Sequence, residues 1–448
     1  MPARQKLDGV RAGMIGFAGL IGLTAGFGAP AQSGAATFSA DPATYRSVVR
    51  DLRPGDRLRL KPGLYRRGLP LIDLHGAPGQ PIEISGPHDG SAVFLGRANH
   101  NTVELRRASH LVLRNLTLDG RNTPFIDAVK AQDVTHHITL EDLEIRNHAA
   151  HQQNVAISTK APAWDWVIRN NRIRNVGTGL YLGDSDGSAP FVRGLIEHNL
   201  IAGTIGYGLQ IKHQRPRPAI AGMPQGTSST IIRHNVISKA DQPQHGFQGP
   251  RPNLLVGHLP PSGPGMEDLY EIYGNLLYQN RTGEVLFQGE GNIAFHHNLL
   301  VNNLGDGILI RPHNDRPRRI AVFHNTVVAR SLGIAVRGAD PAFEQWVVGN
   351  AVFADRPIET PEQASAPDDN LAAGYAAAGD HLRQPFATWP ALDLRPRGEG
   401  LLGPPVDLGR LDALAGYDRD ILGRPRQGLW RGAYAGPGPH WLPGLKVR

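Results

Sequence analysis

The pentapeptide RNNRI at residues 169–173 is the first clear member of a series that recurs along the chain. Each member has Asn at its third position with apolar residues after it, and the others are EHNLI at 197–201, RHNVI at 233–237, YGNLL at 273–277, HHNLL at 296–300, FHNTV at 323–327 and VGNAV at 348–352. Weaker versions, RNLTL at 114–118 and EDLEI at 141–145, extend the series upstream. Successive members lie 23 to 40 residues apart, which indicates a solenoid.

Each repeat contains at least two short runs of alternating apolar residues, such as VAIST at 155–159 and WVIRN at 166–170, and no stretch has a helical period. A leucine-rich horseshoe has one strand per repeat, so the pattern favours a parallel β-helix. We expect the repeated Asn to occupy a sharp turn in the left-handed conformation and to form an amide ladder from coil to coil. The predicted class is therefore all-β, a right-handed parallel β-helix.

The N-terminus has the order of a secretory signal: basic residues, an apolar run from about residue 12 to 27, and then small residues. We expect residues 1–31 to be a signal peptide, the mature chain to begin near Gln32 or Ala36, and the protein to be secreted or periplasmic. No later stretch is apolar enough to span a membrane. The chain has no cysteine, which excludes disulfides and thiolate metal sites.

We expect the β-helix to cover residues 37–356. Asp41-Pro42-Ala43-Thr44 predicts a helix start, and this helix is expected to cap the first coil. From about Pro357 the repeat is lost, so residues 357–448 are expected to form an irregular C-terminal cap and tail.

The net charge is +7, with no cluster of Lys and Arg interleaved with aromatic residues. This composition fits an anionic ligand and argues against nucleic-acid binding. We expect a monomer.

The segments PGDRLRLKPGLY at 54–65 and GAPGQPIEISG at 76–86 resemble the first coils of the chondroitinase B and alginate lyase family, within the pectate-lyase-like superfamily of right-handed parallel β-helices. The resemblance implies a protein that acts on a polysaccharide, often a uronate-containing one, by lyase, hydrolase or epimerase chemistry. A polysaccharide lyase acting on an acidic polysaccharide is the leading interpretation.

Aligning one strand across the coils, from NVAIST at 154–159 to GIAVRG at 333–338, places the third and fifth residues of each strand outside. In this alignment Gln288 shares a column with Lys212, Arg311 and Arg337, and Leu286 shares one with Tyr181 and Gln210. The predicted surface patch contains Lys212, His213, His258, Gln288, Glu290, Arg311 and His313. Tyr181, Gln210, Arg215 and Arg337 complete the predicted substrate-binding set. Two long coils, ending near Asn235 and Asn275, are expected to wall a cleft beside the patch and to add Arg215, Arg217, His245 and Arg251.

β-Elimination from a uronate needs a group that binds the carboxylate, a base for the C5 proton and an acid for the leaving oxygen. We assign Lys212 as base and Arg311 as carboxylate clamp or acid, matching the Lys and Arg pair that the family resemblance implies. His313 is the third predicted catalytic residue. Three rungs separate Lys212 from Arg311, or roughly 14 Å between backbones.

Two alternatives remain open. Arg311-Pro312-His313-Asn314-Asp315 resembles the Asp-Pro-His-Asp signature of mannuronan C5-epimerases at Pro312 and His313. A non-catalytic polysaccharide-binding or export accessory protein would use the same cleft. Hydrolysis needs a pair of carboxylates, and Glu290 has no evident partner in its column.

The cofactor is left open by the sequence. The related lyases hold calcium in an acidic cluster that precedes their Lys, whereas the preceding coil here offers Asp184-Ser185-Asp186, which departs from that pattern. Calcium is the ion that the resemblance suggests, but this departure gives no basis for assigning a metal ligand.

Overall fold

The computed structural model describes residues 34–243, 245–361, 369–426 and 428–440. The expected signal peptide, residues 1–31, lies outside the described residues. From Ala35 onward the chain forms one compact unit. No helix among the described residues has the length and apolar character needed to cross a bilayer.

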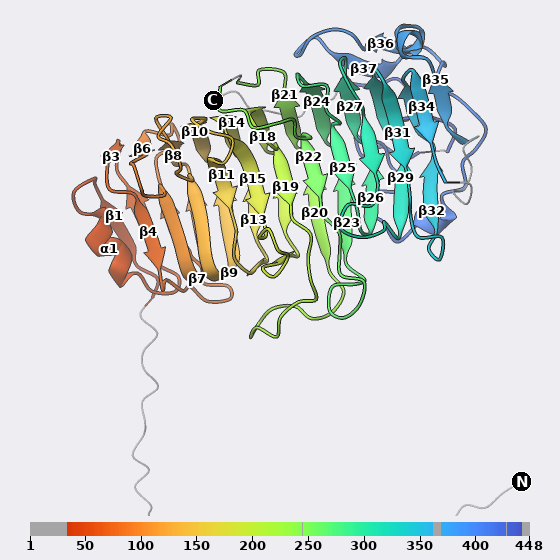
Figure 1. Ribbon diagram of the computed structural model, residues 1–448. Helices are drawn as coiled ribbons and strands as arrows, with labels where there is room; N and C mark the ends of the chain where they lie inside the picture. The colour runs from red at the N-terminus through yellow and green to blue at the C-terminus, as the bar shows by residue number, and fades with distance from the viewer. Residues whose placement is uncertain (1–33, 244, 362–368, 427, 441–448) are drawn as a thin grey trace, which may run out of the picture. The chain divides into compact units, whose positions relative to one another are not determined.

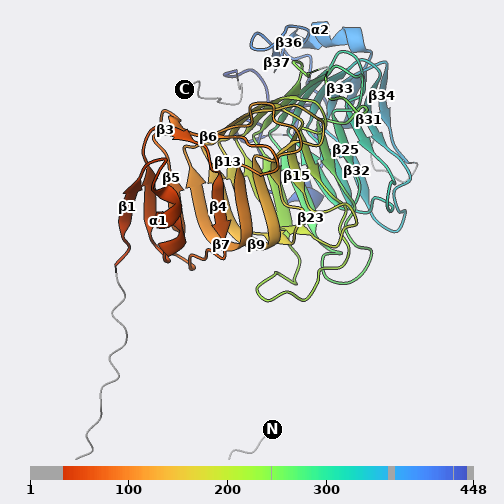
Figure 2. The ribbon, with the colours of Figure 1, turned by 60° about the vertical axis from the view of Figure 1, so that its left-hand side comes forward.

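Parallel strands wind into successive coils, as Figures 1 and 2 show. One coil contains β18 (Leu200–Thr204), β19 (Leu209–Ile211) and β20 (Ser229–Arg233), after which β21 (Val236–Lys239) begins the next. The strands group into sheets of 23 and 12 members, and of the named strands that the structure describes only β36 (Leu382–Gln384) and β37 (Asp393–Pro396) pair in antiparallel fashion. The predicted parallel β-helix is confirmed.

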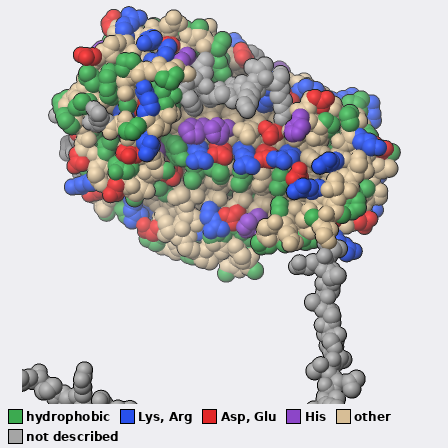
Figure 3. Space-filling view, turned by 180° about the vertical axis from the view of Figure 1, so that it is seen from behind, with side chains coloured by type: hydrophobic (Ala, Val, Ile, Leu, Met, Phe, Trp, Pro, Cys, Tyr) green, Lys and Arg blue, Asp and Glu red, His purple; other side chains and the backbone are tan. Residues whose placement is uncertain are grey.

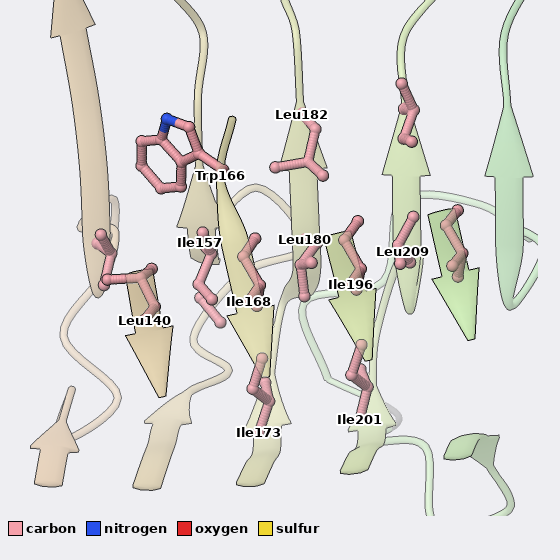
Figure 4. Packing of buried hydrophobic residues seen from close by; sticks show 14 of the residues in the cluster. Leu140, Ile157, Trp166, Ile168, Ile173, Leu180, Leu182, Ile196, Ile201 and Leu209 are labelled. Atoms are coloured by element: carbon pink, nitrogen blue, oxygen red, sulfur yellow. The ribbon is translucent and has the colours of Figure 1, made fainter. Parts of the chain in front are cut away.

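Inward-facing apolar side chains form a continuous stack along the axis. Leu180, Leu209 and Leu254 are register partners on consecutive coils, and all three are fully buried. Figure 4 shows the neighbouring part of the stack, including Leu180, Leu182 and Leu209. All the residues that the alternation assigns to this part of the core are buried: Leu180, Leu182, Leu209, Ile211, Ile308 and Ile310.

The repeated Asn residues form the expected ladder. The amide nitrogen of Asn171 donates to Oδ1 of Asn199 at 2.9 Å, and the same bond continues through Asn235, Asn275, Asn298, Asn325 and Asn350 to Asn370. The expected left-handed conformation belongs instead to the residue before each Asn, for example His198 at φ 55° and His234 at φ 55°. The turn residue and the ladder residue are therefore adjacent, and the Asn side chain is free to satisfy backbone groups of the neighbouring coils.

The strand alignment was wrong at one coil on the predicted surface. Leu254 pairs with Phe287 rather than with Val285, so Gln288 lies between Leu255 and Leu309. The cause is the run from Val285 to Phe287, in which three consecutive side chains are buried and alternation cannot fix the register. A similar shift of two residues places Ser158, not Ala156, beside Tyr181.

Both ends of the β-helix carry additional structure. The helix α1 (Tyr45–Asp51) buries Tyr45 and Val49, and Oδ1 of Asp41 accepts hydrogen bonds from the backbone N–H groups of Ala43 and Thr44. At the other end, parallel pairing continues past residue 356 to β35 (Leu371–Ala373). The following segment covers an apolar flank rather than only the last coil, because Leu382, Leu394 and Tyr434 share a buried cluster with residues from Leu200 to Phe353.

Charged side chains on the outer surface pair across coils. Glu141 contacts both Arg114 and Arg169, and Glu197 contacts Arg233. On the face opposite that of Figure 1, acidic and basic side chains are intermixed and no large area of one sign is visible (Figure 3).

We expect stability to fall in mild acid because several histidines are buried. Burial lowers the pKa of His148 to about 4, with Asp127 and Asp119 opposing this only in part, and lowers the pKa of His296 to about 3. Below the unfolded-state pKa of about 6.5, the unfolded chain binds protons that the native state excludes, so stability is lost as the pH falls from there toward these folded-state values. Each such histidine should lower the free energy of unfolding by roughly 2 kcal/mol between about pH 7 and about pH 5.

Urea unfolding at these two pH values measures the effect. His148→Leu should remove part of the pH dependence, whereas the same change at exposed His88 should leave it intact. An unchanged pH dependence in His148→Leu would contradict the assignment of this loss to His148.

Candidate functional site

A cleft of about 370 Å³ lies on the outer face of three adjacent strands, β19, β22 (Leu254–Val256) and β25 (Phe287–Gly289). Seven of the predicted site residues line it: Gln210, Lys212, His213, Gln288, Glu290, Arg311 and His313. Tyr207, Arg251 and Glu284 close it at the end where these strands begin. Residues separated by more than a hundred positions in sequence thus share one cavity because the coils stack.

At the end of the cleft where the strands finish, residues of successive coils form a single column. Ile211, Val256, Gly289 and Ile310 are register partners on successive coils, so the residues that follow them, Lys212, Gly257, Glu290 and Arg311, occupy equivalent positions. A Cβ at Gly257 would lie 2.2 Å from the backbone nitrogen of His213, so only glycine fits between Lys212 and Glu290. Gly257 therefore contributes no side chain to this column.

Glu290 lines the cleft and also holds a neighbouring loop. Its side chain is buried, and Oε2 accepts hydrogen bonds from the backbone N–H groups of His313 at 3.1 Å, Asn314 at 2.8 Å and Asp315 at 3.3 Å. Oε1 accepts a further bond from the Asn314 amide at 2.7 Å. Both carboxylate oxygens are thus engaged in fixing the loop that presents Arg311 and His313.

Lys212 is half-buried, and this burial lowers the pKa of its amine, while Asp184 and Glu290 act in the opposite direction. Tyr181 does not line the cleft; its ring supports the lysine, with the Lys212 Nζ 5.8 Å from the ring centroid and the Lys160 Nζ 4.7 Å from it. A lysine with a lowered pKa has a larger neutral fraction, which is the form that accepts a proton.

Arg311 and His313 are exposed at the opposite end of the column. Among the described residues, no carboxylate forms an ion pair with Arg311, in contrast to Arg337 on the next coil, which binds Glu359. An unpaired guanidinium beside a cleft suits bidentate binding of a ligand carboxylate.

The floor of the cleft contains an unsatisfied polar group. Gln210 is only 3% exposed, and its Oε1 has no hydrogen-bond partner in the described protein. A buried amide oxygen without a donor is costly unless a bound molecule or water supplies one. Sugar hydroxyl groups are suitable donors.

Four expected site residues lie outside the cavity lining. His258 stacks behind His213, with ring centroids 6.0 Å apart, and its Nδ1 lies 2.6 Å from the Leu259 carbonyl oxygen. Arg215 is exposed, and Arg337 is paired as described above. Tyr181, the fourth, lies beside Lys212 as described above. Of the basic residues expected in the cleft wall, Arg251 lines the cavity, whereas Arg217 is buried in an ion pair with Asp268.

Residues Asp184 to Asp186 do not form a calcium site. Asp184 accepts hydrogen bonds from the backbone N–H of Ala189 and from the Ser188 hydroxyl, and Asp186 accepts one from the backbone N–H of Ser188. Within the described parts of the chain, no group of three carboxylate-bearing side chains lies close enough to share an ion. The two carboxylates stabilise their own turn, and no catalytic step is assigned to calcium.

Comparison with known proteins agrees with the architecture. A family model described as the right handed beta helix region matches residues 155–352, in agreement with the parallel β-helix of the structure. No curated protein sequence matches it significantly.

Among solved structures, the GH136 lacto-N-biosidase from Eubacterium ramulus is similar with a TM-score of 0.50 and 11% identity, covering 76% of this chain and 68% of that one. An alginate lyase from Paenibacillus sp. str. FPU-7 is similar with a TM-score of 0.41 and 15% identity, covering 62% of this chain and 98% of that one. A PL6 family polysaccharide lyase from Pseudopedobacter saltans has a TM-score of 0.38 and 11% identity, covering 75% and 91%. At 11% identity the likeness to the lacto-N-biosidase supports the fold alone, and the function must be argued from the cleft.

Proposed function

We propose that this protein is an exported, monomeric polysaccharide lyase that cleaves an acidic, uronate-containing polysaccharide by β-elimination. The observation that carries the proposal is the column in the cleft, where a half-buried lysine of lowered pKa and an unpaired arginine flank Gly257. These are the groups that elimination needs around the C5 carbon of a uronate.

A uronate ring placed over Gly257 lies between the long side chains of Lys212 and Arg311. Arg311 binds the carboxylate and so makes the C5 proton more acidic, and the neutral amine of Lys212 removes that proton. The C4–O bond breaks, a C4=C5 double bond forms, and the leaving oxygen takes a proton from an acid, for which His313 is the candidate. Glu290 acts as a positioning residue, because it holds the loop that carries Arg311 and His313.

Hydrolysis fits the cleft less well. Glycoside hydrolysis uses two carboxyl groups, one on each side of the bond that breaks. Glu284 and Glu290 both line the cleft, but both carboxylate oxygens of Glu290 accept hydrogen bonds from the 313–315 loop. One free carboxylate remains in the lining, which is insufficient for this chemistry.

The test uses protein recovered from the periplasm of an expression host, whose mass also shows whether the chain begins near Gln32 or Ala36. It is incubated with a panel of acidic polysaccharides while the ultraviolet absorbance of the unsaturated uronate product is followed. We expect absorbance to rise with at least one polymer and the polymer to shorten.

Two other outcomes would replace the proposal. Exchange of the C5 proton for deuterium in D₂O, without a rise in absorbance or shortening, would identify a C5-epimerase, for which the Pro312-His313 resemblance is the motivating feature. Retardation of the protein in a gel containing an intact polymer, without either reaction, would identify a binding or export accessory protein.

A further inference from the structure

Three histidines gather at a corner of the β-helix, on strands other than those that form the cleft. His110 lies in β7 (Val103–Arg114), and His136 and His137 lie in the next coil, in β9 (Val129–Glu141). Each offers one ring nitrogen, and these nitrogens all lie within 4.8 Å of one another. The Nδ1 atoms of His136 and His137 are 2.8 Å apart, and the rings of His110 and His137 stack with centroids 4.3 Å apart.

The surrounding residues orient this cluster. His137 Nε2 lies 3.3 Å from Oδ2 of Asp165, and Arg193 binds both oxygens of that carboxylate. A proton held on Nε2 leaves Nδ1 of His137 as an acceptor, and this atom faces Nδ1 of His136. The ring of His136 lies flat on Trp164, with centroids 4.5 Å apart and an interplanar angle of 8°. A carboxylate that holds the far nitrogen of a histidine is the usual second partner of a metal-binding imidazole.

A further ring nitrogen is unsatisfied. Nδ1 of His110 is buried and has no hydrogen-bond partner in the described protein. His110, His137, Asp165 and Arg193 also line a groove of about 500 Å³, which gives solvent or a further ligand access to the cluster. Three imidazole nitrogens within 4.8 Å of one another, beside an open groove, supply the number of protein ligands found in a zinc centre that keeps one exchangeable position.

We propose that His110, His136 and His137 bind a divalent transition-metal ion, Zn²⁺ in the first instance, with Asp165 orienting His137. Imidazole nitrogen suits zinc, which binds it at about 2.0–2.1 Å in tetrahedral geometry. The ligand nitrogens of such a site lie about 3.4 Å apart, so the pair at 2.8 Å needs to open only slightly. The ion would join two consecutive coils near the N-terminal end of the β-helix.

The test uses tag-free protein, because a histidine tag binds the same ions, after treatment with a chelator that is then removed. Calorimetric titration with ZnCl₂ should show one ion per chain with a micromolar or tighter dissociation constant, and zinc should raise the melting temperature. Titration with Co²⁺ should produce visible absorption bands typical of nitrogen ligation. None of these readouts depends on activity in the cleft, so this inference stands or fails separately from the proposed function.

Variants locate the ion. His110→Ala and exposed His137→Ala should abolish tight binding, and Asp165→Asn, which preserves shape, should weaken it by about ten- to a hundred-fold. The control is His198→Ala, which removes one member of the stacked pair His198 and His234. Among the described residues, no third histidine or carboxylate lies close enough to complete a metal site there. The proposal is overturned if wild-type protein shows no saturable binding up to millimolar zinc. It is also overturned if folded His137→Ala and Asp165→Asn proteins bind zinc as tightly as the wild type.

Discussion

Replacing Ile211 with Asp is expected to prevent the protein from folding. Ile211 is fully buried, between its register partners Leu182 and Val256. A carboxylate at this position has no cation within the apolar stack, and an unpaired buried charge costs several kcal/mol, out of a total stability of about 5–15 kcal/mol. Periplasmic expression followed by circular dichroism and urea unfolding would show little soluble protein and no cooperative transition.

The matched control is the same substitution at an outward-facing isoleucine. Ile72 ends β4 (Leu69–Ile72) and is 41% exposed, so Ile72→Asp should lower stability by about 1 kcal/mol or less. A soluble Ile211→Asp protein with a normal cooperative transition would contradict the core described above.

Removing the amine of Lys212 is expected to abolish most turnover while the fold is retained. On the proposed mechanism this amine is the base, and the loss of a general base typically lowers kcat by about 10²–10⁴. Lys212→Arg separates this role from simple charge, because arginine keeps the positive charge but stays protonated at neutral pH. It should therefore bind the polymer and still fail to turn it over. Initial rates with the polymer that gives the strongest absorbance change provide the measurement.

Arg311→Ala and His313→Ala should each remove most turnover as well, since these side chains flank the same column. Arg337→Ala is the matched control, because Arg337 follows Arg311 on the next coil but is already paired with Glu359. Full activity in all three cleft variants would place the reaction elsewhere on the β-helix. Loss with Arg311→Ala and His313→Ala, but not with Lys212→Ala, would identify another base and move the reacting centre to the Arg311 end.

The sequence was sufficient to predict a parallel β-helix, because one Asn in each coil marks the same turn. It was insufficient for the register of every strand, since a run such as Val285-Leu286-Phe287 is buried throughout and carries no alternation. Lys212 and Arg311 were nevertheless placed correctly in one column, because each is the charged residue that directly follows the last residue of its strand, Ile211 or Ile310.

Other parts of the candidate site depend on contacts that no local pattern encodes. Glu290 was expected to face substrate, but its role is set by a loop that folds back onto it more than twenty residues later. Tyr207 and Glu284 were not predicted, because they precede their strands, whereas the predicted patch contains residues at the other ends of the strands, where Lys212 and Arg311 lie. His110 directly follows Ser109, and His137 directly follows His136, which is the register partner of Ser109. The proximity of His110 and His137 could therefore have been inferred from their spacing of one coil.

The Asn ladder also shows that coils of different length stack in the same way. Asn199 bonds Asn235 at 2.9 Å across a coil of 36 residues, and Asn235 bonds Asn275 at 3.0 Å across one of 40, just as Asn171 bonds Asn199 across 28. The additional residues of the long coils lie between the paired strands, so these loops can differ in length while the strands and the Asn ladder keep their pairing. A β-helix of this kind is therefore a scaffold on which specificity for new polymers can be grafted by loop replacement, while the coils beneath remain unchanged.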